Sequence, residues 1–239
     1  MDIEIAKSVP GIDLVIGGHS HTKMLNEEGS NYSYPEMVGS VPVVQAYAYT
    51  KYLGKLTVSF DGSGNVTSAT GDPILLDASI IPDEETAARI AEMGAPIEEM
   101  KNKVVANAAS DIDGDRANCR VRECQMGNLV ADAMLERVSS QGVEIAIQNG
   151  GGLRASIGAG DVTMGDVLTV LPFQNTLSTF EVTGETIVAA LENGVSQMEE
   201  VKGRFPQVAG LSFTVNPSAE VGSRISKVLV GGSPIDLGK

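Results

Sequence analysis

The chain has 239 residues, of which 42% are hydrophobic and 20% charged, and this composition is typical of globular proteins with one large or two ordinary domains. Its 17 basic and 31 acidic side chains give a net charge of −14, which argues against nucleic acid polymers and anionic membranes as partners. No apolar run reaches the ~18 residues of a transmembrane span. Met1 is followed by the acidic DIEIAKS, which is not a signal-peptide pattern.

The first part of the chain is predicted to be rich in strands. Residues 12–16 (IDLVI) predict a short buried strand that ends at Gly17 and Gly18. Residues 23–40 predict an irregular loop. Residues 41–49 and 52–61 are rich in β-forming residues and precede the turn sequence DGSGN, so we expect them to form an antiparallel edge of the same sheet.

A helical connector is expected next. Residues 82–93 (PDEETAARIAEM) open with a proline and three acids, which favour a helix N-terminus. Apolar residues continue at helical spacing, and Gly94 and Pro96 should kink or split the helix. We therefore predict a linker over residues 78–103, between a domain over 1–77 and a second domain over 104–239.

The second domain is predicted to mix helices and strands. One helix is expected from Met126 to Val138, with its apolar face formed by Met126, Leu129, Val130, Ala133, Met134 and Val138. A capping box TMGD starts another helix that runs through Val170, and Thr183 caps a third that ends at Asn193 and Gly194. Strands are expected at 143–148, 177–183, 211–216 and 225–232.

Several side chains are candidates for binding. His19 and His21, the only histidines, lie in a loop from which both imidazoles could reach a metal ion, although such a pair can also be without a ligand. The glycines of NGGGLR (149–154) would let backbone N–H groups approach an anion, with Arg154 as a further donor. The alternative is a tight turn with a surface arginine.

Arg116, Arg120 and Arg122 cluster in a chain that is short of positive charge. Phe173, in LPFQN, could stack on a planar base or pack in the core. Cys119 and Cys124 could form a disulfide that closes a tight loop around Arg120, or could be two unlinked thiols.

Taken in order, these segments resemble the 5′-nucleotidase family. GGHSHT resembles the family's last metal-binding motif, and VPVVQAYAYTKYLGKL resembles the hairpin that closes its metal domain. CRVRECQMGNLVADAM, NGGGLR, GDVTMGDVLTVLPF and VTGETIVAALENGV resemble successive blocks of its C-terminal domain. The resemblance implies the end of a calcineurin-like metallophosphoesterase β-sandwich, a linker helix and an incomplete, mixed α/β nucleotide-binding domain.

The resemblance also implies roles for particular residues. His19 and His21 match metal-binding positions of a dinuclear centre that uses zinc or manganese. Arg116, Arg120 and Arg154 match arginines at the phosphate end of the nucleotide, Asn149 matches a base contact, and Phe173 matches a base-stacking aromatic. The Cys119–Cys124 spacing matches a family disulfide, which fits a periplasmic or extracellular protein.

The family's other metal ligands, its catalytic His–Asp pair and its second base-stacking block have no counterpart in the chain. The resemblance therefore implies a 5′-nucleotidase in which this chain mainly binds the nucleotide and is inactive alone. The alternatives are a 2′,3′-cyclic-nucleotide phosphodiesterase with 3′-nucleotidase activity, a UDP-sugar hydrolase, a non-catalytic nucleotide-binding fragment, and a sulfur-oxidation homologue of the same fold. No oligomeric state is predicted.

Overall fold

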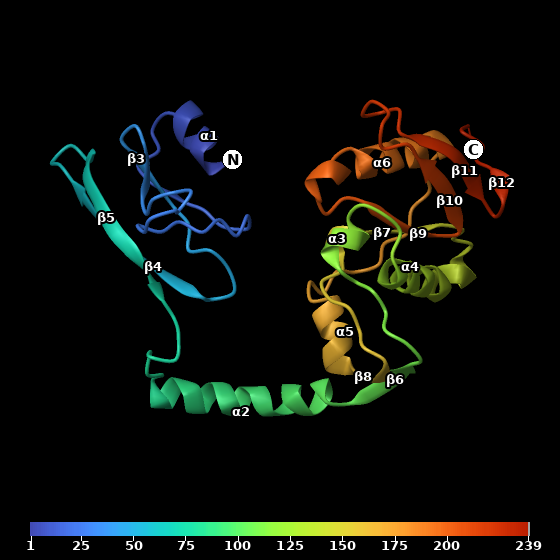
Figure 1. Ribbon diagram of the computed structural model, residues 1–239, viewed down its shortest axis with the longest axis horizontal. Coiled ribbons are helices and arrows are strands. Elements are labelled where there is room, and N and C mark those ends of the chain that lie inside the picture. The colour runs from blue at the N-terminus through green and yellow to red at the C-terminus, as the bar shows by residue number, and fades with distance from the viewer. Residues whose placement is uncertain (239) are drawn as a thin grey trace. The chain divides into compact units, whose positions relative to one another are not determined.

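The computed structural model describes residues 1–238 and separates into two units, Met1–Ala88 and Arg89–Lys239 (Figure 1). Both units combine helices and strands, which confirms the predicted mixed α/β fold class. The domain boundaries that we expect at residues 77 and 103 stay predictions. Among the described residues, no helix is both long enough and apolar enough to cross a membrane.

The first unit contains one helix, a small mixed sheet and a long hairpin. The helix is α1 (Asp2–Ser8), and the sheet has the order β1 (Val15–Ile16), β3 (Val41–Val44), β2 (Glu36–Val38). β1 and β3 are parallel, whereas β2 and β3 are antiparallel. The core beside this sheet includes Ala6, Met24, Tyr34, Val43 and Val44. The hairpin of β4 (Tyr52–Phe60) and β5 (Val66–Leu75) forms a separate two-stranded ribbon (Figure 1).

Three expectations for the first unit are wrong. The strand at 12–16 is reduced to β1, in which Ile16 is 77% exposed rather than buried. The segment 23–40 is not wholly irregular, because it contains β2. Residues 41–49 and 52–61 do not pair with each other, since β3 lies between β1 and β2 while β4 pairs with β5. Strand pairing depends on contacts far apart in the chain, which local β-propensity does not specify.

The predicted connector is one continuous helix, α2 (Glu84–Lys101). It begins after Asp83, whose carboxylate accepts a hydrogen bond from the Thr86 backbone N–H at 2.8 Å. Of the predicted kink or split at Gly94 and Pro96, the split is wrong, because Pro96 lies inside the continuous helix, and the kink stays a prediction. None of its residues is buried. Proline removes a single helical hydrogen bond, and in an exposed helix water can satisfy the carbonyl that it frees.

Besides most of α2, the second unit contains four α-helices and seven strands among the described residues. Its helices are α3 (Arg116–Cys119), α4 (Gln125–Val138), α5 (Met164–Val170) and α6 (Gly184–Val195). Its strands are β6 (Val104–Ala108), β7 (Ala146–Asn149), β8 (Gly160–Thr163), β9 (Pro206–Ala209), β10 (Leu211–Val215), β11 (Ile225–Val230) and β12 (Ser233–Pro234). β6 pairs with β8, β7 with β9, and β10, β11 and β12 form a three-stranded antiparallel sheet.

Local side-chain hydrogen bonds start these helices where the sequence predicts. Thr163 and Asp166 form the predicted capping box of α5, which ends at Val170 as expected. The Thr183 side chain accepts a hydrogen bond from the Thr186 backbone N–H and caps α6. Such caps satisfy the unpaired N–H groups of the first helical turn, so they can be recognised from a few neighbouring residues.

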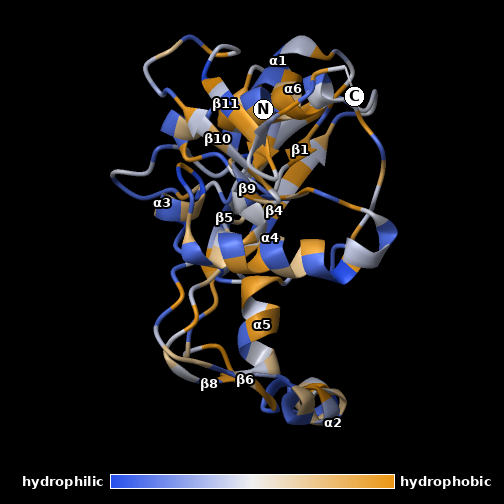
Figure 2. Cartoon of the chain, turned by 90° about the vertical axis from the view of Figure 1, so that its right-hand side faces the viewer, coloured by the Kyte–Doolittle hydropathy of each residue, from blue (hydrophilic) through white to orange (hydrophobic). Residues whose placement is uncertain are grey.

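The apolar face predicted for helix α4 is borne out in part, since Met126 and Val138 are buried and Val130 and Met134 are half-buried. Leu129 and Ala133 are exposed, whereas Gly127 and Ala131 are buried with Met126 and Val138. Apolar and polar residues alternate along the helix (Figure 2). The small Gly127 and Ala131 allow close packing against neighbouring segments, a role that a hydrophobicity pattern weights too little.

Residues 177–183 do not form the predicted strand. Leu177, Phe180 and Val182 are exposed, and Phe180 is 78% exposed. Within the described part of the chain, no backbone–backbone hydrogen bond involves residues 172–182. The segment has the composition of a strand, but a ladder requires a partner strand as well as the appropriate residues.

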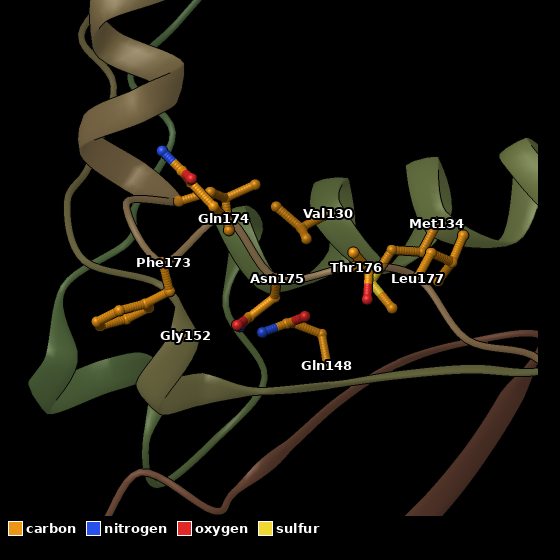
Figure 3. A pocket seen from close by; sticks show the side chains of 10 residues that line it. Val130, Met134, Gln148, Gly152, Phe173, Gln174, Asn175, Thr176 and Leu177 are labelled. Carbon is orange, nitrogen blue, oxygen red and sulfur yellow. The ribbon is translucent and has the colours of Figure 1, made fainter.

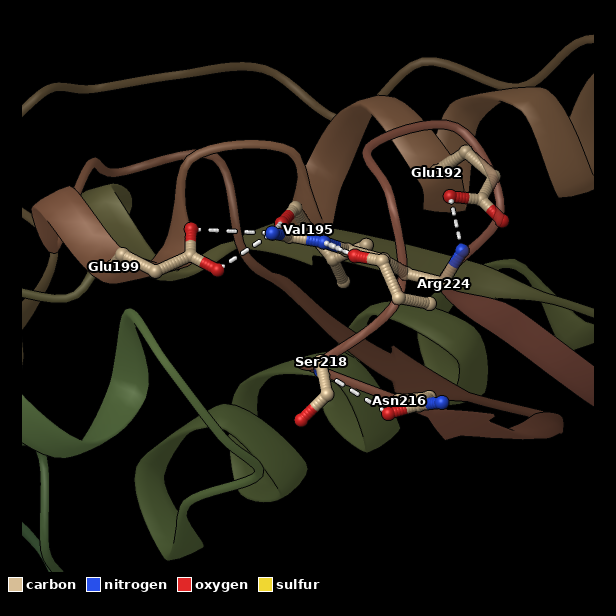
Figure 4. Close-up of polar contacts among 7 residues, drawn as sticks. Glu192, Val195, Glu199, Asn216, Ser218 and Arg224 are labelled. Carbon is tan, nitrogen blue, oxygen red and sulfur yellow. Dashed lines mark hydrogen bonds and ion pairs between the residues drawn. The ribbon is translucent and has the colours of Figure 1, made fainter.

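A buried arginine holds the connection between α6 and β11 (Figure 4). Arg224 is 7% exposed and pairs with the Glu199 carboxylate at 2.6 Å, while its Nη1 also donates to the Val195 carbonyl at 2.8 Å. The Glu192 carboxylate accepts hydrogen bonds from the backbone N–H groups of Arg224 and Ile225. These contacts satisfy a charged group that would otherwise be costly to bury.

Candidate functional site

The histidine loop follows β1 in the first unit. His19 and His21 have positive φ angles of 64° and 55°, and both side chains are exposed. The Gly17 backbone N–H donates to the Val44 carbonyl at 2.8 Å, which extends the pairing of β1 with β3 up to the loop. The His21 ring lies edge-on to the Tyr49 ring, with 5.1 Å between ring centroids.

Gln45 fastens this loop to the residue after β3. Its side chain is 3% exposed, and its Oε1 accepts hydrogen bonds from the Ser20 hydroxyl at 3.2 Å and from the Thr22 backbone N–H. Sequence reasoning missed Gln45. The available signal in the sequence was a polar residue directly after the apolar run VPVV. The structure shows that this run forms a strand parallel to the one before the histidines.

The described residues do not complete a metal site. Within residues 1–238, no three His, Cys, Asp or Glu side chains lie together so that they could hold a metal ion. His19 and His21 supply two imidazoles, whereas zinc sites have at least three protein ligands. The donor set in this chain therefore does not fit a metal centre by itself.

A disulfide organises the arginine-rich loop of the second unit. Cys119 and Cys124 are bonded, with 2.06 Å between the sulfur atoms, and they are 0% and 6% exposed. Cys119 ends α3 and Cys124 is the N-cap residue of α4. The bonded cysteines pack in a core with Met126 and Leu153. The disulfide alternative of the sequence analysis is thus confirmed.

Three of the predicted arginines lie near enough for their charges to interact. Arg116 is on α3, Arg120 follows it, and Arg154 follows the 3-10 turn of the glycine run. Burial lowers the pKa of the Arg120 guanidinium, and the positive charges of Arg116 and Arg154 lower it further. The Nε of Arg120 is buried with no hydrogen-bond partner among the described residues. Repulsion and an unused donor both favour an anion at this place.

Arg154 connects the cluster to the predicted stacking residue. Its guanidinium lies 5.4 Å from the centroid of the Phe173 ring, and its Nη1 donates to the Gly151 carbonyl at 3.4 Å. Phe173 is 54% exposed, so it is a surface aromatic and not a core residue. An exposed ring beside a positive charge can accept a flat base on its face.

Asn149 lies at the end of β7, where the chain enters the glycine run. Its Nδ2 donates to the Gly203 carbonyl at 3.1 Å, and that carbonyl also accepts from the Gly151 backbone N–H at 2.8 Å. A Cβ added to Gly151 would lie 2.7 Å from the Gly203 Cα, so both backbones require glycine for this approach. The run is therefore a close backbone contact and not simply a flexible turn.

A pocket of about 190 Å³ adjoins Phe173 (Figure 3). Phe173 lies at one end, and Met134 and Leu177 lie at the other. Its lining residues are Val130, Met134, Gln148, Gly152, Leu171, Phe173, Gln174, Asn175, Thr176 and Leu177. In the second unit the fold holds Arg120 within the electrostatic influence of Arg116 and Arg154, despite their repulsion, and places Phe173 beside Arg154. Asn149 and the glycine run share the Gly203 carbonyl.

Sequence reasoning also missed Gln207, in β9. This side chain is 1% exposed and hydrogen-bonds to backbone groups of the disulfide loop. Its partners lie more than eighty residues earlier in the chain. The local signal in the sequence is weak, since Gln207 is simply a polar residue shortly before the strand predicted at 211–216.

Known proteins resemble the chain over almost all its length. The family model for the 5′-nucleotidase C-terminal domain matches residues 103–239. The trifunctional nucleotide phosphoesterase protein YfkN of Bacillus subtilis is 39% identical over 96% of this chain and 16% of its own length. The 5′-nucleotidase of Bos taurus is 36% identical over 96% of this chain and 44% of its own length.

Among solved structures, the 5′-nucleotidase precursor of Thermus thermophilus is 38% identical, with a TM-score of 0.69. The match covers 100% of this chain and 50% of that protein. The chain thus spans at most half the length of these relatives.

Proposed function

Because the chain belongs to the 5′-nucleotidase family of hydrolases, we propose that it forms the nucleotide-binding part of an enzyme that removes the 5′-phosphate from nucleotides. The observation that supports this most is that Arg154 adjoins the exposed Phe173, while its charge and that of Arg116 act on Arg120. A chain with a net charge of −14 repels phosphate in general, so a local positive cluster is needed to bind it.

The proposed division of labour follows from the chemistry of each side chain. The arginines bind the phosphate end through charge-assisted hydrogen bonds, for which the buried Arg120 Nε has an unused N–H. Phe173 stacks on the base, and Asn149, which the Gly203 carbonyl holds at the start of the glycine run, contacts the base. The disulfide limits the motion of the loop around Arg120, which lowers the entropy lost on binding.

For the whole protein we propose two divalent metal ions, zinc or manganese, and a periplasmic or extracellular location. Such ions would activate a water molecule and stabilise the attacked phosphoryl group. His19 and His21 are the residues of this chain proposed to contact them, and the described residues complete no metal site. The location is supported by the disulfide, which persists in oxidising compartments.

A second proposal concerns substrate range. The Bacillus subtilis relative, which is named a trifunctional nucleotide phosphoesterase, is 39% identical to the chain. The whole protein would then have cyclic-nucleotide phosphodiesterase, 3′-nucleotidase or UDP-sugar hydrolase activity. These activities should be assayed beside 5′-nucleotidase activity. Turnover of 2′,3′-cyclic nucleotides without turnover of AMP would favour this second proposal over the first.

Calorimetric titration of the chain with AMP, adenosine and inorganic phosphate tests the binding proposal. We expect AMP to bind more tightly than adenosine. Arg120→Met should weaken AMP about tenfold and leave adenosine unchanged, because one charge-assisted contact to phosphate is lost. Phe173→Ala should weaken both ligands by ~1–3 kcal/mol, because stacking on the base is lost.

Arg122→Met is the matched control, since Arg122 lies in the same disulfide loop but bonds to the Asn118 side chain and is exposed. It should leave both affinities unchanged. Equal affinities of the unmodified chain for AMP and adenosine would contradict the assignment of the arginine cluster to phosphate.

A further inference from the structure

Gln207 is a fully buried polar side chain that faces the arginine-bearing loop. It lies in β9 opposite Gln148 of β7, and only 1% of its surface is exposed. A buried amide is costly unless its donors and acceptor find partners. The identity of those partners therefore shows what the side chain holds in place.

All the hydrogen bonds of the Gln207 amide go to one short loop. Its Nε2 donates to the Cys119 carbonyl at 2.9 Å and to the Arg122 carbonyl at 2.7 Å. Its Oε1 accepts from the Cys124 backbone N–H at 3.2 Å. The three partners surround Arg120, so one side chain from a distant strand fixes the backbone on both sides of that arginine.

The Gln207 amide packs directly against Gly127 of α4, where a side chain would collide with it. A Cβ added to Gly127 of α4 would lie 2.1 Å from the Gln207 Oε1. The disulfide joins the ends of the loop, but Gln207 is the side chain that reaches it from β9. Removing the amide would leave two loop carbonyls and one N–H without their partner.

The segment before Gln207 contacts the same site through its carbonyls. The Val201 carbonyl accepts from Arg120 Nη1 at 3.3 Å, and the Gly203 carbonyl accepts from Asn149 Nδ2 at 3.1 Å. Val201 has a φ of 53°, which is strained for a β-branched residue. Residues 201–207 therefore hold the Arg120 backbone, the Arg120 side chain and the Asn149 side chain.

We propose that Gln207 is a positioning residue that sets the direction of the Arg120 guanidinium toward the nucleotide's phosphate. This inference rests on the proposed function, because it requires that Arg120 binds phosphate. Gln207 itself, with only 1% of its surface exposed, is too deeply buried to touch the nucleotide. Its loss should change the contribution of the phosphate to binding and leave the contribution of the base intact.

Gln207→Met tests the proposal, because methionine has a similar volume and cannot make the three hydrogen bonds. We expect AMP to bind about tenfold more weakly, adenosine to bind as before, and the Cys124 amide to exchange with solvent faster. Gln207→Glu, which keeps the acceptor for the Cys124 N–H and loses the donors as a carboxylate, should also lower the preference for AMP.

Val228→Ala is the control for general loss of stability. Val228 is buried in the separate core of α6, β10 and β11, away from the disulfide loop. It should lower the melting temperature and leave the ratio of AMP to adenosine affinity unchanged. That ratio is a readout that a merely structural role of Gln207 would not move.

The two proposals fail in different ways. If the unmodified chain does not prefer AMP to adenosine, the proposed function fails and this inference fails with it. If the unmodified chain prefers AMP and both Gln207 variants keep the full preference, the positioning role is wrong while the proposed function stands.

Discussion

The histidine loop of the first unit and the arginine loop of the second unit are both fastened by a buried glutamine from a later strand or strand end. Gln45 bonds to Ser20 and Thr22 beside the histidines, and Gln207 bonds to the loop around Arg120. The loops differ in what they present. His19 and His21 are exposed and have too few partners for a metal, whereas Arg120 lies among other arginines.

This difference concerns the completeness of each site. Anion binding needs donors and positive charge on one wall, and the second unit supplies both from its own residues. Metal binding needs several ligands around one point, and the described residues of the first unit supply two imidazoles. Binding and chemistry should therefore be separable in this chain.

The largest expected effect is a complete separation of binding from turnover. We expect the purified 239-residue chain to bind AMP and to release no phosphate from it when Zn²⁺ or Mn²⁺ is added. A phosphate-release assay beside the calorimetric titration measures both properties on one sample. Metal-dependent turnover that is lost in His19→Ala would show that this chain completes a metal centre, and would remove the contrast between the two loops.

The second prediction concerns the disulfide that closes the arginine loop. Cys119→Ser combined with Cys124→Ser should lower the free energy of unfolding by about 2 kcal/mol, because a short closed loop no longer restricts the unfolded chain. Denaturant unfolding measures the change. AMP affinity should fall more than adenosine affinity, since Arg120 lies between the two cysteines.

A reducing agent provides the control for this change. The reducing agent should lower the free energy of unfolding and the AMP affinity of the unmodified protein as the double substitution does. It should change neither quantity in the double variant. If the double variant keeps its full AMP affinity, Gln207 alone is sufficient to hold the loop, and the disulfide contributes to stability only.

The parts of the fold that the sequence predicted are those determined by neighbouring residues. Thr163 with Asp166, and Thr183 with Thr186, cap helices through hydrogen bonds across three residues. The strands with which β3 and β4 each pair could not be predicted, because the choice of partner depends on segments far away along the chain. For the same reason residues 177–183 looked like a strand although the described residues provide no partner.

The candidate site shows the same limit at the level of side chains. Arginines, glycines and cysteines are informative as residue types, and the structure joins Arg120 to Arg116 and Arg154 and bonds Cys119 to Cys124. Gln45 and Gln207 carry no such information, since glutamine is usually a surface residue. Their roles follow only from the burial and hydrogen bonds that the fold creates.

The smallest expected effect is the loss of stability of the second unit at low pH when one ion pair, between Glu199 and Arg224, is broken. The Arg224 guanidinium, by its hydrogen bond, lowers the pKa of the Glu199 carboxyl from its usual 4.5. A carboxyl with a lowered pKa in the folded state contributes stability above about pH 4.5, and this contribution is lost as the pH falls through the folded-state value. Glu199 is 55% exposed, so the effect should be small.

Thermal unfolding near neutral pH and at about pH 4 measures this contribution. Glu199→Gln should lower the melting temperature near neutral pH, where the ion pair is intact, and should reduce the further loss on acidification. Glu200→Gln is the matched control, because among the described residues Glu200 pairs with the exposed Lys202, at 3.6 Å. An acid-dependent loss that is equal in the unmodified protein and in Glu199→Gln would mean that other carboxylates govern the acid response.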